Sequence, residues 1–244
     1  MEVFISSGTH IDEVSGRVNA INQHLESPGV VFGEAGEATL TEQIREIAHL
    51  FPRAPLISLG AAFLVLVAYP IGGLILSIVS GGSKGRDKDI MQRIKNEHGA
   101  EIQEIDLVHP ALPIYENPLQ WAFLNWGPLV AVPLFASRYY SLLGTIYIST
   151  LVLLMTTLVL FIIMLYFVNT RREDAMAGTI QSHTEDVDSA CIVLGEGHHW
   201  GVGERLVSHE GIDVINPTPM NPDWSTKLGR YIWKLFDQIR VIQK

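Results

Sequence analysis

The sequence predicts an α/β protein whose discontinuous parallel-sheet core is interrupted by transmembrane helices. In the polar parts of the chain, short apolar runs alternate with helical patterns, as they do where crossover helices join parallel strands. Three stretches without charged residues, 56–83, 117–137 and 139–170, separate those polar parts. A bilayer crossing requires about 20 apolar residues, so these stretches have the length of membrane segments.

The polar parts predict three pieces of one α/β core. Residues 1–55 form the first piece, with strands at 3–6 and 28–34 and helices at 14–25 and 40–51. Residues 84–116 form the second piece, with a helix at 86–99 and a strand at 100–106. Residues 171–224 form the third piece, with helices at 172–183 and 201–211 and strands at 190–195 and 212–215.

The apolar stretches differ in how clearly they predict a crossing. Residues 139–170 exceed the required length, and residues 117–137 just reach it despite Pro128 and Pro133, which membrane helices tolerate. Together, residues 117–170 predict a transmembrane hairpin. Pro70, Gly72 and Gly73 break residues 56–83, which are expected to be re-entrant or transmembrane. A buried core helix is the alternative for each stretch.

The last segment, residues 225–244, predicts a basic amphipathic helix. Its five basic residues and Asp237 give a net charge of +4, although the whole chain carries −9. Such a helix suits the anionic surface of a membrane, and a helix that docks on the α/β core is the alternative.

The composition argues against several classes of protein. The net charge of −9 argues against a nucleic-acid partner bound through overall basicity, and the single cysteine, Cys191, excludes an internal disulfide framework. Charged residues make up 18% of the chain, fewer than the roughly 25% of ordinary soluble proteins. The sequence does not predict an oligomeric state.

Four motifs contain the residues that could form a functional site. His10 ends the run Ser-Gly-Thr-His after the first strand, and Glu34 ends the second strand. Arg172 opens the run Arg-Glu-Asp-Ala-Met-Ala after the long apolar stretch, and His198 ends the run Gly-Glu-Gly-His after strand 190–195. The carboxyl ends of parallel strands meet at one crevice, where ligands bind. Two imidazoles and a carboxylate there suit Zn²⁺, Mn²⁺ or Co²⁺, whereas hydrogen-bonded structural histidines are the alternative.

The order of these motifs resembles the TraB/PrgY/Tiki family. The segments LGEGHHWGVGERLVSHEGIDV, RREDAMAGTI, VVFGEAGEA and HGAEIQEIDL resemble family motifs, and the last places Asp106 at a strand end. The resemblance covers residues 3–50, 86–109 and 171–216. Departures are Ser7 at the place of the first motif glycine, and Ala38 and Leu107 near or at places where the family has arginine.

The resemblance implies a membrane-integrated, metal-dependent hydrolase of small or signalling peptides. It implies His10, Glu34 and His198 as ligands of Mn, Co or Zn, with Glu34 also a catalytic base and Arg172 its electrostatic partner. A non-catalytic membrane module that binds or sequesters a peptide is the alternative, and the compressed first motif and missing arginines favour it. Both functions involve a peptide and membrane lipids.

A site shared by His10 and His198 requires an even number of membrane crossings between them. The positive-inside rule places the basic residues that follow the first and third stretches in the cytoplasm, and with them the polar core of a multi-pass protein of the cell membrane. Residues 56–83 would then be re-entrant; the alternative has the first and third stretches as the two spans. The basic residues are Lys84, Arg86, Lys88, Arg93, Lys95, Arg171 and Arg172.

Overall fold

The chain forms two compact units, each built from separate stretches of sequence. The computed structural model describes residues 1–8, 14–34, 39–68, 70–71, 87–105, 108–219, 222 and 224–242. The first, which we call the sheet unit, comprises Met1–Gly36, Ser80–Val108 and Asn169–Lys244. The second, the apolar unit, comprises Glu37–Val79 and His109–Val168.

The sheet unit is an α/β fold around five parallel strands, as the alternation of short apolar runs predicted. The strand order is β3-β2-β4-β1-β5. Strand β4 pairs with β1 on one side and with β2 on the other, so the strand that enters the sheet late in the sequence lies at its centre. The strands are β1 (Glu2–Gly8), β2 (Val30–Gly33), β3 (Glu101–Glu104), β4 (Ser189–Gly195) and β5 (Asp213–Val214).

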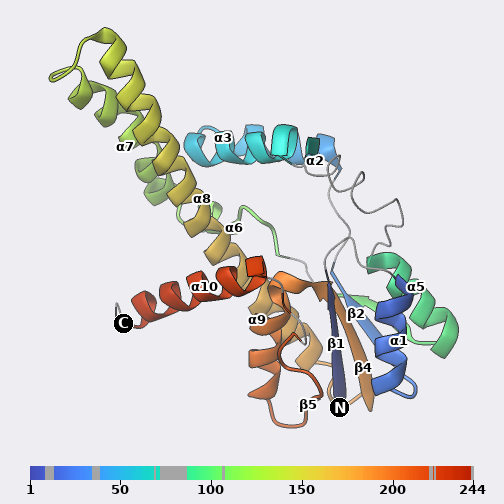
Figure 1. Ribbon diagram of the computed structural model, residues 1–244. Helices are drawn as coiled ribbons and strands as arrows, with labels where there is room; N and C mark the ends of the chain where they lie inside the picture. Colours follow the sequence, from blue (N-terminus) through green and yellow to red (C-terminus); the bar gives the residue numbers. More distant parts are fainter. Residues whose placement is uncertain are drawn as a thin grey trace. The chain divides into compact units, whose positions relative to one another are not determined.

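Helices cover both faces of the sheet (Figure 1). Helices α1 (Val14–His24) and α5 (Asp87–His98) pack on the face that includes Phe4 and Cys191. The end of α8 (Leu142–Gln181) and α9 (Glu196–Val207) pack on the face that includes Ile5 and Ile192. Successive strand residues point to opposite faces, so a strand covered on both faces must be apolar throughout. Strand β4 meets this requirement with Ala190 to Leu194 fully buried.

Between the neighbouring strands β1 and β4, the crossover connections change direction across the sheet. Helix α1 follows β1 and leads to β2, whereas α9 follows β4 and leads to β5 on the other side of the sheet. These helices cover opposite faces. Open α/β sheets bind ligands outside the carboxyl ends of the strands at such a point.

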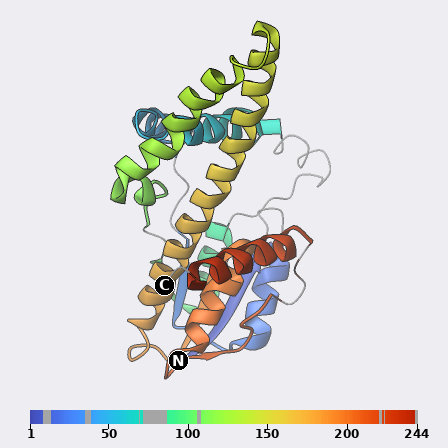
Figure 2. The same ribbon diagram turned by 90° about the vertical axis from the view of Figure 1, so that its left-hand side faces the viewer.

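Helix α10 (Trp224–Ile242) belongs to the sheet unit and contacts α9. Figure 2 shows it in dark red across the orange α9. The docking position that sequence analysis offered as one of two alternatives is therefore occupied. One face of the helix remains exposed, with Leu228 and Tyr231 accessible to solvent.

The apolar unit contains the remaining helices, and its boundary differs from the expected one. The sequence predicts residues 40–51 as part of the α/β core, but Leu50 packs with Leu56, Ile114 and Trp121. An amphipathic pattern predicts a buried helical face without identifying what covers it. The helices of this unit are α2 (Leu40–Leu50), α3 (Pro55–Phe63) with its π-helical continuation η1 (Leu64–Ala68), α6 (Leu112–Glu116), α7 (Pro118–Ala136) and the first part of α8.

By length and composition, α7 and α8 are apolar enough to cross a membrane. Only 17% and 22% of their most apolar windows are buried, whereas the core helix of a soluble protein would be mostly buried. Leu119 and Leu143, for example, are 86% and 80% exposed. Residues 55–68 form a shorter apolar helix, and most of the Pro-Gly-broken part of the first stretch lies outside the described residues.

Helix α8 continues without a break from the apolar stretch into the sheet unit. Its 40 residues correspond to a length of about 60 Å, twice the hydrocarbon thickness of a bilayer. The sequence predicts a separate helix at residues 172–183. No glycine or proline lies between Gly144 and Gly178, so the polar residues from Asn169 onward change the surroundings of the helix without ending it.

The substitution Met176→Ala tests whether α8 is an integral part of the sheet unit. Met176 is fully buried against the sheet, so we expect its truncation to lower the free energy of unfolding by about 2–5 kcal/mol. The control is Met155→Ala on the same helix, where the side chain is 56% exposed and we expect little change. Thermal unfolding of the detergent-solubilised protein measures both, and equal effects would contradict the assignment.

Candidate functional site

Glu34 joins three elements at the carboxyl edge of the sheet. It directly follows β2, and its Oε1 accepts a hydrogen bond of 2.8 Å from the backbone N–H of Gly195 at the end of β4. Its Oε2 lies 3.4 Å from Nη2 of Arg172 on α8. The structure thus brings together two of the residues that sequence analysis selected, Glu34 and Arg172. The carboxylate has both a backbone donor and a cationic partner.

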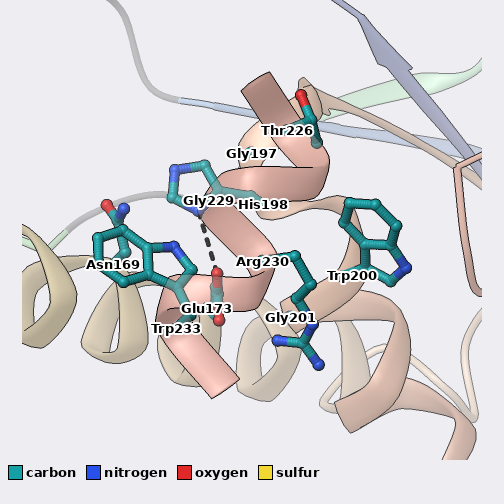
Figure 3. A pocket seen from close by; sticks show the side chains of 10 residues that line it. All are labelled: Asn169, Glu173, Gly197, His198, Trp200, Gly201, Thr226, Gly229, Arg230 and Trp233. Carbon is teal, nitrogen blue, oxygen red and sulfur yellow. Dashed lines mark ion pairs between the residues drawn. The ribbon is translucent and has the colours of Figure 1, made fainter. Parts of the chain in front are cut away.

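His198 lies in the first turn of α9, which begins directly after β4 with Gly195 as its N-cap. Its side chain is buried, and its Nδ1 lies 3.5 Å from Oε1 of Glu173 on α8. This is an ion-pair distance, and Nδ1 makes no hydrogen bond. Figure 3 shows the two side chains pointing toward each other. Interaction of Nδ1 with a carboxylate leaves Nε2 as the nitrogen available to a substrate or metal.

Glu173, which sequence analysis did not select, is the buried anion of this site. Its Oε2 accepts a hydrogen bond of 2.9 Å from Nη1 of Arg205, and Arg205 also binds Asp174 through Nε at 2.6 Å. A buried carboxylate is costly unless a cation and hydrogen-bond donors accompany it, and Arg205 supplies both. The signal in the sequence was its position next to Arg172, but the sequence alone does not show which of two adjacent helical residues points inward.

A glycine allows Glu173 to approach α9. A Cβ atom built on Gly201 would clash with the side-chain carboxylate of Glu173. The backbone carbonyl of Gly201 also accepts a hydrogen bond of 2.7 Å from Arg205. The carboxylate end of the Glu173 side chain therefore lies directly against α9 at this residue.

His198 and Glu173 line an open cavity of about 270 Å³. Three helices contribute to it, with α10 forming one wall, and two tryptophans add aromatic surface. Its residues include an acid, a histidine and a cation, so it combines apolar walls with a few polar groups, as ligand sites do. The lining residues are Asn169, Glu173, Gly197, His198, Trp200, Gly201, Thr226, Gly229, Arg230 and Trp233 (Figure 3).

His199 has a structural role that its neighbour does not share. Its Nε2–H donates to the backbone carbonyl of Asn216 at 2.8 Å, and its Nδ1 accepts from the hydroxyl of Ser7 at 2.5 Å. This pattern corresponds to a neutral ring that joins α9 to β1 and to the segment after β5. The side chain of Asn216 in turn bonds both the N–H and the carbonyl of Ile5. Ser7, which stands where the resembled motif has its first glycine, therefore has a hydrogen-bond partner in His199.

Two residues selected from the sequence, His10 and Asp106, lie outside the described residues. Within the part of the chain that the structure describes, no three His, Cys, Asp or Glu side chains form a group that could hold a metal. The two described candidates nevertheless have suitable chemistry. A carboxylate oxygen lies 3.5 Å from Nδ1 of His198, on the side where metal-bound histidines commonly have a carboxylate, and Glu34 is a carboxylate at the same sheet edge.

Comparison of the chain with protein-family models, with curated proteins and with solved structures gave no match. The motifs are therefore the sole basis of the family resemblance.

We expect Gly201→Ala to disrupt the support of His198. The new methyl group would displace the carboxylate of Glu173 and lower the free energy of unfolding by about 1–3 kcal/mol. Gly197→Ala is the matched control, because nothing lies within 4 Å of a Cβ built there and alanine favours a helix. Unfolding midpoints of the two variants measure the difference. Equal midpoints would contradict the close approach of Glu173 to α9.

Burial of His199 predicts a pH-dependent stability. Desolvation lowers its pKa below the usual 6.5, and the hydrogen bond to Asn216 only partly opposes this. The unfolded chain then binds a proton more readily than the folded protein. The stabilising contribution is therefore complete above the unfolded pKa and declines as the pH falls below it, by at most about 1.4 kcal/mol per pH unit.

Unfolding of the wild type and of His199→Gln between pH 7.5 and pH 5.5 measures this contribution. We expect a weaker pH dependence in the variant. His49→Gln, at an exposed histidine, is the control and should retain the wild-type dependence. An unchanged dependence in His199→Gln would show that other groups cause it.

Proposed function

We propose that this protein is a membrane-integrated, metal-dependent hydrolase of small or signalling peptides. The observation that carries the proposal is the arrangement of Glu34 and His198. They follow β2 and β4, whose carboxyl ends lie side by side. This is next to the point where the crossover connections change direction across the sheet. His10, which follows β1 in the sequence, would be the third member of the set.

Each residue has a separate role in this proposal. His198, Glu34 and His10 would hold a divalent metal, which when bound supplies Lewis-acid polarisation of the scissile amide and a more acidic bound water. Glu34 is oriented by the N–H of Gly195, and the guanidinium of Arg172 beside it offers positive charge to a carbonyl or carboxylate of the peptide. Glu173 keeps the ring of His198 in position.

The cavity beside His198 favours a short segment of peptide. Its volume of about 270 Å³ lies just below the range of pockets for drug-sized molecules. Trp200 and Trp233 offer apolar surface to a side chain, while Arg230 and Asn169 offer donors to peptide carbonyls. This division suits a peptide, which carries both kinds of group.

The membrane assignment is part of the proposal. The length and exposed apolar surface of α7 and α8 support a transmembrane hairpin. Two crossings keep residues 1–8 and the site residues of α8 and α9 on one side of the bilayer, which a shared site requires. The basic residues that follow the apolar stretches favour the cytoplasmic side, in a multi-pass protein of the cell membrane.

A non-catalytic module that binds or sequesters a peptide is the second candidate. Both oxygens of Glu34 already have partners, Gly195 and Arg172, and this favours a structural carboxylate over a base or metal ligand. The cavity would then bind the peptide without cleaving it.

Metal content and peptide cleavage by the detergent-purified full chain test the proposal. We expect Mn, Co or Zn in the wild type and in His49→Ala, and its loss in His198→Ala. We expect Glu173→Gln to weaken metal affinity about 10–100-fold, because it removes the support of the ligand and leaves the ligand in place. A peptide library incubated with and without a chelator then reports cleavage.

The two candidates give different results. Metal at the level of the His198→Ala variant, together with peptides that bind and remain intact, would support the binding module. Cleavage that a chelator abolishes and the same metal restores would support the hydrolase.

A further inference from the structure

Helix α10 has two different faces. One face lines the cavity of His198 with Thr226, Gly229, Arg230 and Trp233. Residues of a helix advance by 100° each, so Leu228, Tyr231 and Leu235 lie on the opposite side. Their side chains are 48%, 63% and 43% exposed, and these three residues form what we call the outer face.

The cavity side of α10 is held by specific contacts. Arg230 forms an ion pair with Glu204 of α9, and the Trp233 side chain contributes to the cavity wall. The contacts that dock α10 on the sheet unit are therefore made without the outer face. An aromatic and two leucine side chains at i, i+3 and i+7 form a continuous apolar strip, which water solvates poorly.

The charges beside the outer face indicate its partner. Lys227 and Lys234 are exposed and lie next to the apolar strip on the same helix. The segment 225–244 carries a net charge of +4 in a chain whose total is −9. An apolar strip with adjacent lysines matches the boundary between acyl chains and anionic headgroups, where lysines reach the phosphates and an aromatic ring lies at headgroup depth.

We propose that the outer face of α10 docks on the surface of an anionic bilayer. The proposal rests on the membrane location in the proposed function and extends it to the cavity. Because one helix carries the outer face and the cavity wall, docking holds this wall of the His198 cavity in place, with the cavity on the side of α10 that faces away from the lipid. An apolar protein partner would be bound by the apolar strip alone and would not require the lysines beside it.

Depth-dependent quenching in nanodiscs tests the docking. The full chain carries Cys191→Ala, which removes its one cysteine, and an environment-sensitive fluorophore on Tyr231→Cys. Nanodiscs contain nitroxide-labelled lipids, with either neutral lipid alone or about 30% anionic lipid. The control is the same fluorophore on Lys95→Cys, an exposed position on α5 of the same unit.

We expect quenching at residue 231 to be at least two-fold stronger than at residue 95 in anionic nanodiscs. We expect Lys227→Glu with Lys234→Glu, or high salt, to reduce it toward the control. Quenching equal to that at residue 95 would overturn the proposal. Protection of residue 231 from the lipid quencher by a second copy of the chain or by another protein would also overturn it. Equal quenching in neutral and anionic nanodiscs would overturn the role of charge. None of these readouts depends on metal or on cleavage, so they fail independently of the proposed hydrolase.

Discussion

The position of β4 between β1 and β2 is the constraint on which the candidate site depends. Strand β4 pairs with seven residues of β1 and with four residues of β2, and its residues Ala190 to Leu194 are buried on both faces. This pairing fixes where Gly195 lies, and Gly195 both donates to Glu34 and precedes the first turn of α9. The location of His198 is therefore a consequence of strand pairing, and loop conformation contributes little to it.

A second requirement is that the site contains a buried carboxylate. Glu173 is 7% exposed and would be strongly unfavourable without Arg205, which connects it to Asp174 and to the backbone of α9. The same helix that carries Glu173 begins in the apolar unit. One continuous helix thus supplies both the most apolar segment of the chain and the most buried acid of the site.

The sequence was sufficient for the strands, because apolar runs bounded by glycine, proline and polar residues have few other interpretations in a protein of this composition. The family resemblance implied Arg172 as an electrostatic partner of the site, and the structure places its Nη2 3.4 Å from Oε2 of Glu34. The sequence did not assign α2 to its unit, because periodicity does not identify a partner. It did not detect the continuity of α8, where charges mark a new environment, or select Glu173, whose orientation depends on the glycine at residue 201 of another helix.

The strand order also determines when the site can exist during synthesis. Strands β1 and β2 are made early and do not pair with each other. Strand β2 can pair with β3, but β1 and β2 join one sheet only through β4, which begins at Ser189. By then the ribosome has already produced α7 and all of α8, so the apolar helices are complete before the sheet can close. Such long-range parallel pairing is slow, and the unpaired edges of the early strands require protection until β4 arrives. The sheet unit can therefore be completed only after the helices of the apolar unit have been made.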